Sequence, residues 1–387
     1  MMTMIKYNNN NERIVKKVKF ICNTADLHKA VQSVIPAIAS KPSTPIFGGM
    51  HIIAANQTIR LEAMDINLSM SCELKGEIEE EGEIVIAAIR FSELVRNFNG
   101  ETVKITKNNN DNNVRLQSGK ADYKILLMNV NDYPKYPKIE AAQSFTLEDE
   151  KNKELIKKTA FACSTDTARP LFTGVLCEIK EGKITFVGTN THRLAIRTLP
   201  IENTPDMSLI IPSSVLKEIN KNLNGKLPQE AKFSLINNQL MVSIDDWTVV
   251  SRLIEGRFPD YKRVIPPEFA VKTKVNVKEF GGAVSRMSLC SGSDDNYSIV
   301  KISIDAGELK VMSSSPDVGT GEEVIACETE GNAINVAFNA TYILDIMKNL
   351  ETEEAELNLN NSLSPVCIKP TDQSEYIYIV TPVRVIF

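Results

Sequence analysis

A threefold internal repeat is the feature that most constrains how this chain can fold. Segments reading RFSELVRNFNG, VLKEINKNLNG and YILDIMKNLET begin at Arg90, Val215 and Tyr342, so they recur after 125 and 127 residues. In each segment apolar residues stand at positions i, i+3 and i+7, which lie along one stripe of a helix. The chain therefore contains the same amphipathic helix three times at nearly constant spacing.

Residues suited to helix ends flank these segments. Ser213 or Ser214 precedes the second segment and Asn339 precedes the third. Their side chains can accept hydrogen bonds from the free N–H groups of a first helical turn. Gly100 and Gly225 follow the first two segments, and we expect them to end those helices.

A second set of matching segments opens each repeat. FICNTADLHKAVQSVI from Phe20, FTLEDEKNKELIKKTAF from Phe145 and VNVKEFGGAVSRMSL from Val275 each predict a strand followed by a helix. Alternating apolar and polar residues elsewhere predict about eight strands in every repeat. The predicted fold class is α+β, with three tandem similar domains of two helices backed by antiparallel sheets. We expect them at 19–143, 144–270 and 271–387, after a flexible extension over residues 1–18.

The composition restricts the partners and the chemistry of such a chain. The formal net charge is −5, so any contact with nucleic acid must come from a local positive face. The seven cysteines are scattered and form no C-x-x-C pair, which indicates reduced thiols and no zinc site. We expect no metal and no cofactor. No run of about 18 apolar residues predicts a membrane span, no signal peptide is recognisable, and we expect a cytoplasmic protein.

Three short motifs complete the pattern, namely THRLA, GRFPDY and a terminal TPVRVIF. Together with the repeat they resemble the bacterial DNA polymerase III beta subunits, the beta sliding clamps, from Lys19 to Arg384. The resemblance implies the DNA clamp fold, in which a head-to-tail homodimeric ring of six domains encircles duplex DNA with helices lining the hole. It implies a processivity factor that tethers the replicative polymerase. The implied partners are double-stranded DNA of any sequence, the polymerase catalytic subunit, the clamp loader and other proteins with a clamp-binding motif.

The expected ring has room for DNA. Twelve helices spaced about 10 Å apart draw a circle about 38 Å across. Subtracting about 10 Å for helix thickness leaves a hole of about 28 Å, which is wide enough for a hydrated duplex.

Sliding requires attraction to phosphates without base readout. We expect the helical cations Arg96, Lys217 and Lys221 to face DNA, although an ordinary solvated helix face would explain each of them singly. The resemblance adds the loop residues Lys41 and Arg169.

The resemblance also implies a dimer interface. It brings Tyr123 and Ile125 against the helix end near Leu289 of the second subunit. Cationic Arg90 and Arg96 then face an acidic stretch that contains Asp317, Glu322 and Glu323. The alternative is that these are two unrelated charged surfaces.

The stretch GTNTHRLAI from Gly188 holds His192, one of only three histidines. A catalytic histidine needs an orienting carboxylate and a nucleophile or metal, and none stands nearby in the sequence. One alternative function is a hydrolase that pairs His192 with Asp245 or Asp246, and another is a structural repeat protein without a DNA role. Equal thirds argue against an enzyme, because an active site does not require them.

A structural histidine in a strand-edge turn would be the plainest interpretation of His192. The resemblance instead makes THRL one wall of an apolar groove that captures short peptides from polymerases, the clamp loader and repair proteins. The groove residues that it implies are Phe172, Gly174, Thr189, His192, Arg193, Leu194, Pro259, Arg263, Val264, Leu363, Pro365, Ile379, Val380, Thr381, Pro382, Val383 and Arg384.

Overall fold

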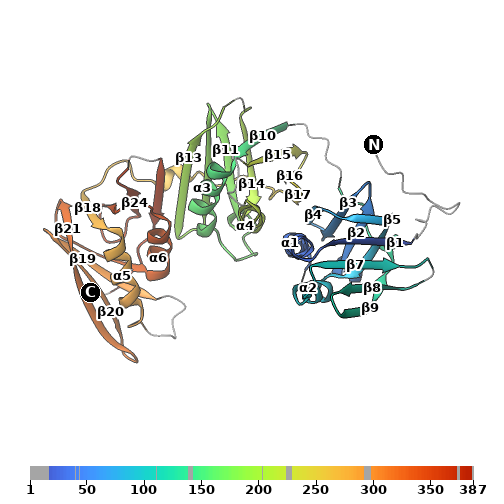
Figure 1. The fold of residues 1–387 in the computed structure, drawn as a ribbon. Helices are drawn as coiled ribbons and strands as arrows, with labels where there is room; N and C mark the ends of the chain where they lie inside the picture. Colours follow the sequence, from blue (N-terminus) through green and yellow to red (C-terminus); the bar gives the residue numbers. More distant parts are fainter. Residues whose placement is uncertain are drawn as a thin grey trace. The chain divides into compact units, whose positions relative to one another are not determined.

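The predicted order of helices and strands recurs three times along the chain (Figure 1). The structure is a computed structural model that describes residues 17–39, 41–42, 44–109, 111–137, 143–202, 204–223, 229–291, 298–372 and 375–385. Residues 1–16 of the expected N-terminal extension lie outside this part of the chain, as does Gly225.

In the part of the chain that the structure describes, each repeat has two α-helices, as predicted. The first repeat comprises β1 (Val18–Asn23), α1 (Thr24–Val34), β2 (Gly49–Ala55), β3 (Thr58–Met64), β4 (Leu68–Lys75), β5 (Glu77–Glu80), β6 (Gly82–Ala87), α2 (Ala88–Arg96), β7 (Thr102–Lys107), β8 (Asn113–Ser118) and β9 (Ala121–Met128). The second comprises β10 (Gln143–Glu148), α3 (Asp149–Thr159), β11 (Gly174–Lys180), β12 (Lys183–Thr189), β13 (Arg193–Pro200), β14 (Met207–Pro212), α4 (Ser213–Asn222), β15 (Glu230–Ile236), β16 (Gln239–Ile244) and β17 (Trp247–Arg252). The third comprises β18 (Val271–Asn276), α5 (Val277–Ser288), β19 (Ile299–Asp305), β20 (Glu308–Ser315), β21 (Gly319–Glu330), β22 (Ile334–Asn339), α6 (Ala340–Asn349), β23 (Glu354–Leu359), β24 (Val366–Pro370) and β25 (Tyr376–Val380).

Short 3-10 helices connect several of these elements. They are η1 (Ile35–Ala37), η2 (Pro45–Gly48), η3 (Val130–Asp132), η4 (Ala160–Ala162), η5 (Pro170–Thr173) and η6 (Tyr261–Val264).

Local sequence determines where these helices begin. The prediction for α6 is confirmed, because the Asn339 side chain accepts a hydrogen bond of 2.9 Å from the Thr341 N–H. The prediction for Gly100 is wrong. α2 ends at Arg96, and its C-cap Asn97 has φ −101°, so no left-handed glycine ends the helix. Gly100 instead permits close backbone packing, since a Cβ there would lie 2.4 Å from the Gly119 nitrogen.

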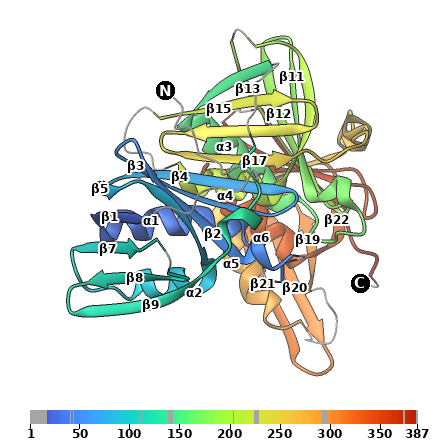
Figure 2. The same ribbon diagram turned by 90° about the vertical axis from the view of Figure 1, so that its right-hand side faces the viewer.

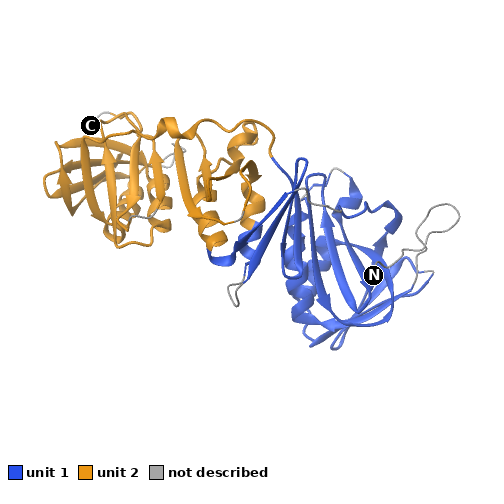
Figure 3. Cartoon of the chain, turned by 90° about the horizontal axis from the view of Figure 1, so that it is seen from above, with its two compact units in different colours: residues 1–150, 218–253 blue, residues 151–217, 254–387 orange. Residues whose placement is uncertain are grey.

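The chain packs into two compact units, residues 1–150 with 218–253 and residues 151–217 with 254–387 (Figure 3). Each unit contains one continuous sheet. The first has thirteen described strands in the order β10-β15-β16-β17-β4-β3-β2-β6-β9-β8-β7-β1-β5. The second has twelve described strands in the order β14-β11-β12-β13-β25-β24-β23-β18-β21-β20-β19-β22. The elements of the second repeat are therefore divided between the two units.

Strand pairing between repeats explains this division. β17 of the second repeat pairs antiparallel with β4 of the first. β25 of the third repeat pairs antiparallel with β13 of the second. Each pairing makes one sheet of two repeats, so the sheets do not end at the repeat boundaries.

The apolar stripes of the helices face the cores, as their periodicity predicts. In the second unit, Phe280 of α5 and Ile343 and Ile346 of α6 are fully buried in one cluster. The same cluster includes Ala162 and Ala195 of the second repeat, so its core continues across the repeat boundary. β20 and β21 form a long hairpin in the third repeat (Figure 2).

Candidate functional site

An apolar cavity of about 250 Å³ opens in the second unit beside the turn between β12 and β13. We call it the groove. It brings together ten of the residues implied by the resemblance, which are Phe172, Thr189, His192, Arg193, Leu194, Pro259, Val264, Pro365, Ile379 and Thr381. They come from the second repeat, from the segment after β17 and from the last strands of the third repeat. Buried Leu194 and Ile379 are directly opposite each other in the β13–β25 ladder.

Other expected groove residues do not line this cavity. Val380 follows Ile379 on β25, so its side chain points to the opposite face of the sheet and is fully buried. Gly174 is buried, and a Cβ there would lie 2.6 Å from Ile210 Cγ2. The Arg263 side chain is 84% exposed and pairs with Asp260 at 2.9 Å.

The remaining members of that set lie in the last loop and in the terminal segment. Leu363 is 52% exposed, Pro382 and Val383 are half-buried, and Arg384 is exposed. The Val383 N–H donates to the Ala337 carbonyl at 2.8 Å, which fastens the terminal segment to β22.

Sequence reasoning missed four residues that line the groove, namely Thr191, Phe258, Asp260 and Tyr261. The last three belong to the GRFPDY motif. The motif could have pointed to all of them, but only its Pro259 was assigned to the groove. The Tyr261 hydroxyl donates to Glu178 Oε2 at 3.3 Å. Burial, together with the nearby Glu178 carboxylate, raises the pKa of Tyr261 to about 12, so this phenol is neutral at physiological pH.

Polar side chains shape the turn that carries His192. Asn190 Oδ1 accepts hydrogen bonds from the backbone N–H groups of His192 and Arg193 at 3.1 and 3.0 Å. Thr191 has φ +78°, a left-handed conformation that is uncommon for a β-branched residue. The His192 carbonyl accepts from the Thr381 N–H at 2.9 Å. In the described part of the chain the exposed His192 ring bonds no carboxylate, so it lacks the orienting partner of a catalytic histidine.

The expected DNA-facing cations differ in how available they are. Lys41, Arg96, Arg169 and Lys217 are exposed. Lys221 is also exposed, but its Nζ pairs with Glu218 Oε1 at 2.6 Å one turn earlier on α4. The charge of Lys221 is therefore partly compensated by Glu218 within the same helix.

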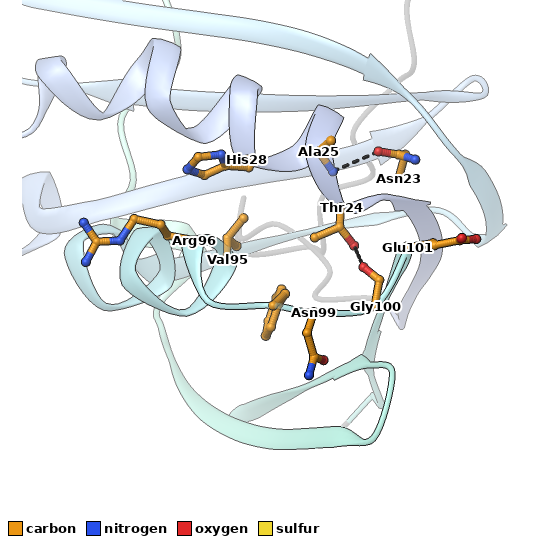
Figure 4. Close-up of a pocket in the computed structure, with 10 residues that line it drawn as sticks. Asn23, Thr24, Ala25, His28, Val95, Arg96, Asn99, Gly100 and Glu101 are labelled. Atoms are coloured by element: carbon orange, nitrogen blue, oxygen red, sulfur yellow. Dashed lines mark hydrogen bonds between the residues drawn. The ribbon is translucent and has the colours of Figure 1, made fainter.

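Arg96 borders a second cavity, of about 600 Å³, between the start of α1 and the end of α2 (Figure 4). Thr24 closes one side, because its hydroxyl donates to the Gly100 carbonyl at 2.6 Å. His28 and Arg96 line the same cavity.

The residues expected at a dimer interface include large exposed apolar side chains. Tyr123 on β9 is 40% exposed, and Leu289 at the end of α5 is 76% exposed. Ile125 is half-buried, and its neighbour Leu126, which sequence reasoning did not select, is 75% exposed.

The charged residues of the expected interface are less simple. Arg90 is exposed on α2. Glu322 pairs with Lys310 at 2.8 Å, and Glu323 accepts from Arg286 Nε at 2.9 Å. Both acids already have partners on their own chain. In the expected interface, Arg90 and Arg96 would therefore compete with Lys310 and Arg286 for these carboxylates.

No cluster of three metal-ligating side chains occurs among the described residues. None of the described helices is long and apolar enough to cross a membrane.

Known proteins resemble this chain over nearly its whole length. Residues 18–137, 146–260 and 262–384 match the models for the N-terminal, central and C-terminal domains of the DNA polymerase III beta subunit. The chain is 29% identical over 379 residues to the beta sliding clamp of Bacillus subtilis (strain 168), covering 95% of this chain and 100% of that protein. It is 28% identical over 383 residues to the beta sliding clamp of Staphylococcus aureus (strain Mu50), covering 96% and 99%.

Solved structures agree with this comparison. The crystal structure of the DNA polymerase sliding clamp from Bacillus subtilis matches with a TM-score of 0.90 at 28% identity, covering 96% of this chain and 100% of that chain. The DNA polymerase III beta subunit from Thermotoga maritima matches with a TM-score of 0.88 at 27% identity, covering 95% and 100%.

Proposed function

Because the chain belongs to the bacterial DNA polymerase III beta subunits, the sliding clamps that give the polymerase its processivity, we propose that it acts as a homodimeric ring around duplex DNA. Members of this family are non-catalytic, so the hydrolase alternative that used His192 with Asp245 or Asp246 is wrong. The ring works in the cytoplasm, where its partners are the clamp loader, the catalytic subunit of the replicative polymerase and other proteins with a clamp-binding motif. The three domains occupy 19–143, 144–270 and 271–387.

The observation that carries the proposal is how neighbouring repeats share strands. The last strand of one repeat pairs with the last strand of a three-stranded meander in the repeat before it, as β17 does with β4 and β25 with β13. Within the described part of the chain, two strands have no such partner in another repeat. They are β9, the last strand of the first repeat, and β21, the last meander strand of the third. Among the described residues, β9 pairs with β6 only at Leu127 and Met128, and β21 pairs with β18 only from Cys327 onward. Two complementary open edges, one in each terminal repeat, favour head-to-tail association with a second copy.

The two strand pairings between repeats also predict the register in which β9 of one subunit would pair with β21 of the other. The meanders align through Met64, Thr189 and Ser314, which are 125 residues apart each time and pair with Ser69, Leu194 and Thr320. The equivalent ladder pairs are Ser69 with Val250 in the first pairing and Leu194 with Ile379 in the second. The last strands begin at Ala121, Trp247 and Tyr376, so Lys124 is equivalent to Val250 and Ile379. This alignment places Lys124 opposite Thr320 of the partner subunit, and Asp122 opposite Glu322 of the partner subunit.

Disulfide trapping tests this assembly. Asp122→Cys combined with Glu322→Cys should give a covalent dimer on mild oxidation, because opposed residues of neighbouring strands lie within disulfide reach. Serine replaces the partly exposed Cys72, Cys290 and Cys327 to prevent exchange. The matched control is Asp122→Cys with Glu323→Cys, whose side chain points to the other face of the sheet. Equal cross-linking of both pairs, or of neither, would contradict the proposed register.

DNA lies against the exposed cations Lys41, Arg96, Arg169 and Lys217, with a smaller contribution from Lys221. Their support is exposure and charge on a chain that is otherwise acidic. A ring holds DNA by topology, so a clamp placed on a nicked circle by its loader should remain there and leave when the circle is cut. Retention that does not depend on DNA ends would refute encirclement.

The groove captures short peptides of the polymerase, the clamp loader and repair proteins. Its support is a concave apolar surface with a polar rim, drawn from two repeats. Phe172→Ala should weaken binding of a fluorescein-labelled peptide that carries the clamp-binding segment of the same organism's replicative polymerase by about tenfold, through lost apolar contact. The covalent dimer described above should still form. Unchanged peptide affinity would remove the groove assignment.

A further inference from the structure

Arg193 lies in the wall of the groove, but its guanidinium is turned into the protein. The side chain is 9% exposed. Nη1 donates to Asp345 Oδ2 of α6 at 2.5 Å, and Nη2 donates to the Phe161 carbonyl of η4 at 2.6 Å. The guanidinium carbon lies 4.6 Å from the centre of the Tyr342 ring and 5.5 Å from that of Phe161. The charge of Arg193 is therefore paired, and its planar face is stacked, within the protein itself.

The backbone of Arg193 fastens the turn that forms the groove wall. Its carbonyl accepts from the Thr189 hydroxyl at 2.6 Å, and its N–H donates to Asn190 Oδ1 at 3.0 Å. Asn190 Nδ2 also reaches the Tyr342 hydroxyl at 3.3 Å. The turn is thus held to α6 twice, by an ion pair and by a weaker hydrogen bond. This anchoring is suited to keep Thr191 in its left-handed conformation and His192 at the rim.

Arg197 provides an internal comparison. It lies on the same strand, and its side chain is also 9% exposed. Its guanidinium pairs with Glu154 of α3 at 2.8 Å. The two carboxylate partners are similarly covered, with side-chain exposures of 28% for Asp345 and 30% for Glu154. Of the two arginines, only Arg193 lines the groove.

We propose that Arg193 is a positioning residue of the groove, which acts on bound peptides through Asp345 and the 189–193 turn instead of through direct contact. This inference rests on the proposed peptide-binding function. It makes Asp345, which does not line the groove, a determinant of peptide affinity. Residues without ligand contact can alter affinity in this way when they select one arrangement of a contacting segment.

Three variants of the full-length protein test the inference by fluorescence anisotropy with the same polymerase-derived peptide. Asp345→Asn keeps the side-chain shape but removes the charge, and it should weaken binding about tenfold. Asp345→Glu keeps the carboxylate, and it should bind within about threefold of the unsubstituted protein. Glu154→Gln removes the partner of Arg197, and it should leave peptide affinity unchanged. Thermal denaturation should show similar destabilisation for Asp345→Asn and Glu154→Gln.

The outcomes separate this inference from the function on which it rests. Loss of affinity in Asp345→Asn alone, with recovery in Asp345→Glu, supports a positioning role. Unchanged affinity in Asp345→Asn overturns it while the groove assignment stands. Equal weakening in Asp345→Asn and Glu154→Gln also overturns it, because general loosening of the fold would then explain the result. If the unsubstituted protein fails to bind the peptide, the groove assignment and this inference both fall.

Discussion

Replacing His51 with glutamine removes the positive charge that two buried glutamates share. His51 of β2 is 3% exposed, and its Nδ1 lies 3.0 Å from Glu62 Oε2 of β3 while its Nε2 lies 2.8 Å from Glu83 Oε2 of β6. Both ring nitrogens lie within hydrogen-bonding distance of a carboxylate, and an imidazolium can donate to both of them. The Tyr133 ring covers it at 5.0 Å. Arg60 also contacts this cluster, because its Nε lies 3.1 Å from Glu62 Oε1.

Removing one member of a buried ion pair costs about 3–5 kcal/mol, because the charges left behind have lost both water and partner. In His51→Gln both carboxylates remain, with side-chain exposures of 4% and 12%, and each has lost the imidazole that bonded it. We therefore expect the free energy of unfolding of the first unit to fall by about 3–5 kcal/mol at pH 6.

The pH dependence has a definite sign. Burial opposes the charge on His51, but the hydrogen bonds to Glu62 and Glu83 outweigh it and raise the pKa of the imidazole above 6.5. A raised pKa in the folded state means that the stabilisation is fully present below pH 6.5 and is lost as the pH rises through the folded-state value. The unsubstituted first unit should therefore lose stability as the pH rises through that value, and His51→Gln should lose much less.

The single tryptophan supplies the assay. Trp247 belongs to the first unit, is 4% exposed and donates from Nε1 to the Ser33 carbonyl at 2.9 Å. Its fluorescence during urea denaturation therefore reports on this unit. A destabilisation below about 1 kcal/mol, or a variant that keeps the pH dependence of the unsubstituted protein, would refute the argument.

Substitutions at four further positions have defined expectations. Gly188→Ala places a Cβ 2.2 Å from the Thr159 carbonyl oxygen, so the second unit should lose about 1–3 kcal/mol in a thermal melt; an unchanged melting temperature would show that the backbone yields easily. Asn339→Ala removes the cap of α6 and should cost about 1 kcal/mol in the same measurement, whereas Asn339→Asp should retain most of the stability. Lys217→Gln should lower the salt dependence of DNA binding by about one unit of slope, and Lys221→Gln by less because Glu218 already pairs with it; equal effects would contradict that ranking.

The family resemblance brought together segments that are far apart in the sequence. The resemblance assigns THRL and the last strand to one groove, and β13 and β25 pair directly. The places of Val380 and Gly174 were not accessible, because they depend on which face of the sheet a residue occupies. The ion pair of Lys221 was missed for a different reason, since the helical cations were chosen by their charge without weighing Glu218 one turn away.

The repeat could be recognised in the sequence because helix and strand periodicities are local. These periodicities predict six helices and their apolar stripes without any knowledge of packing. Tertiary structure alone decided the pairings between distant charges. Arg193 meets Asp345 across 152 positions of sequence, and His51 meets Glu83 across 32. The local sequence around either residue does not predict its partner. Which charges are buried together, and must therefore pair, depends on how the sheets and helices pack.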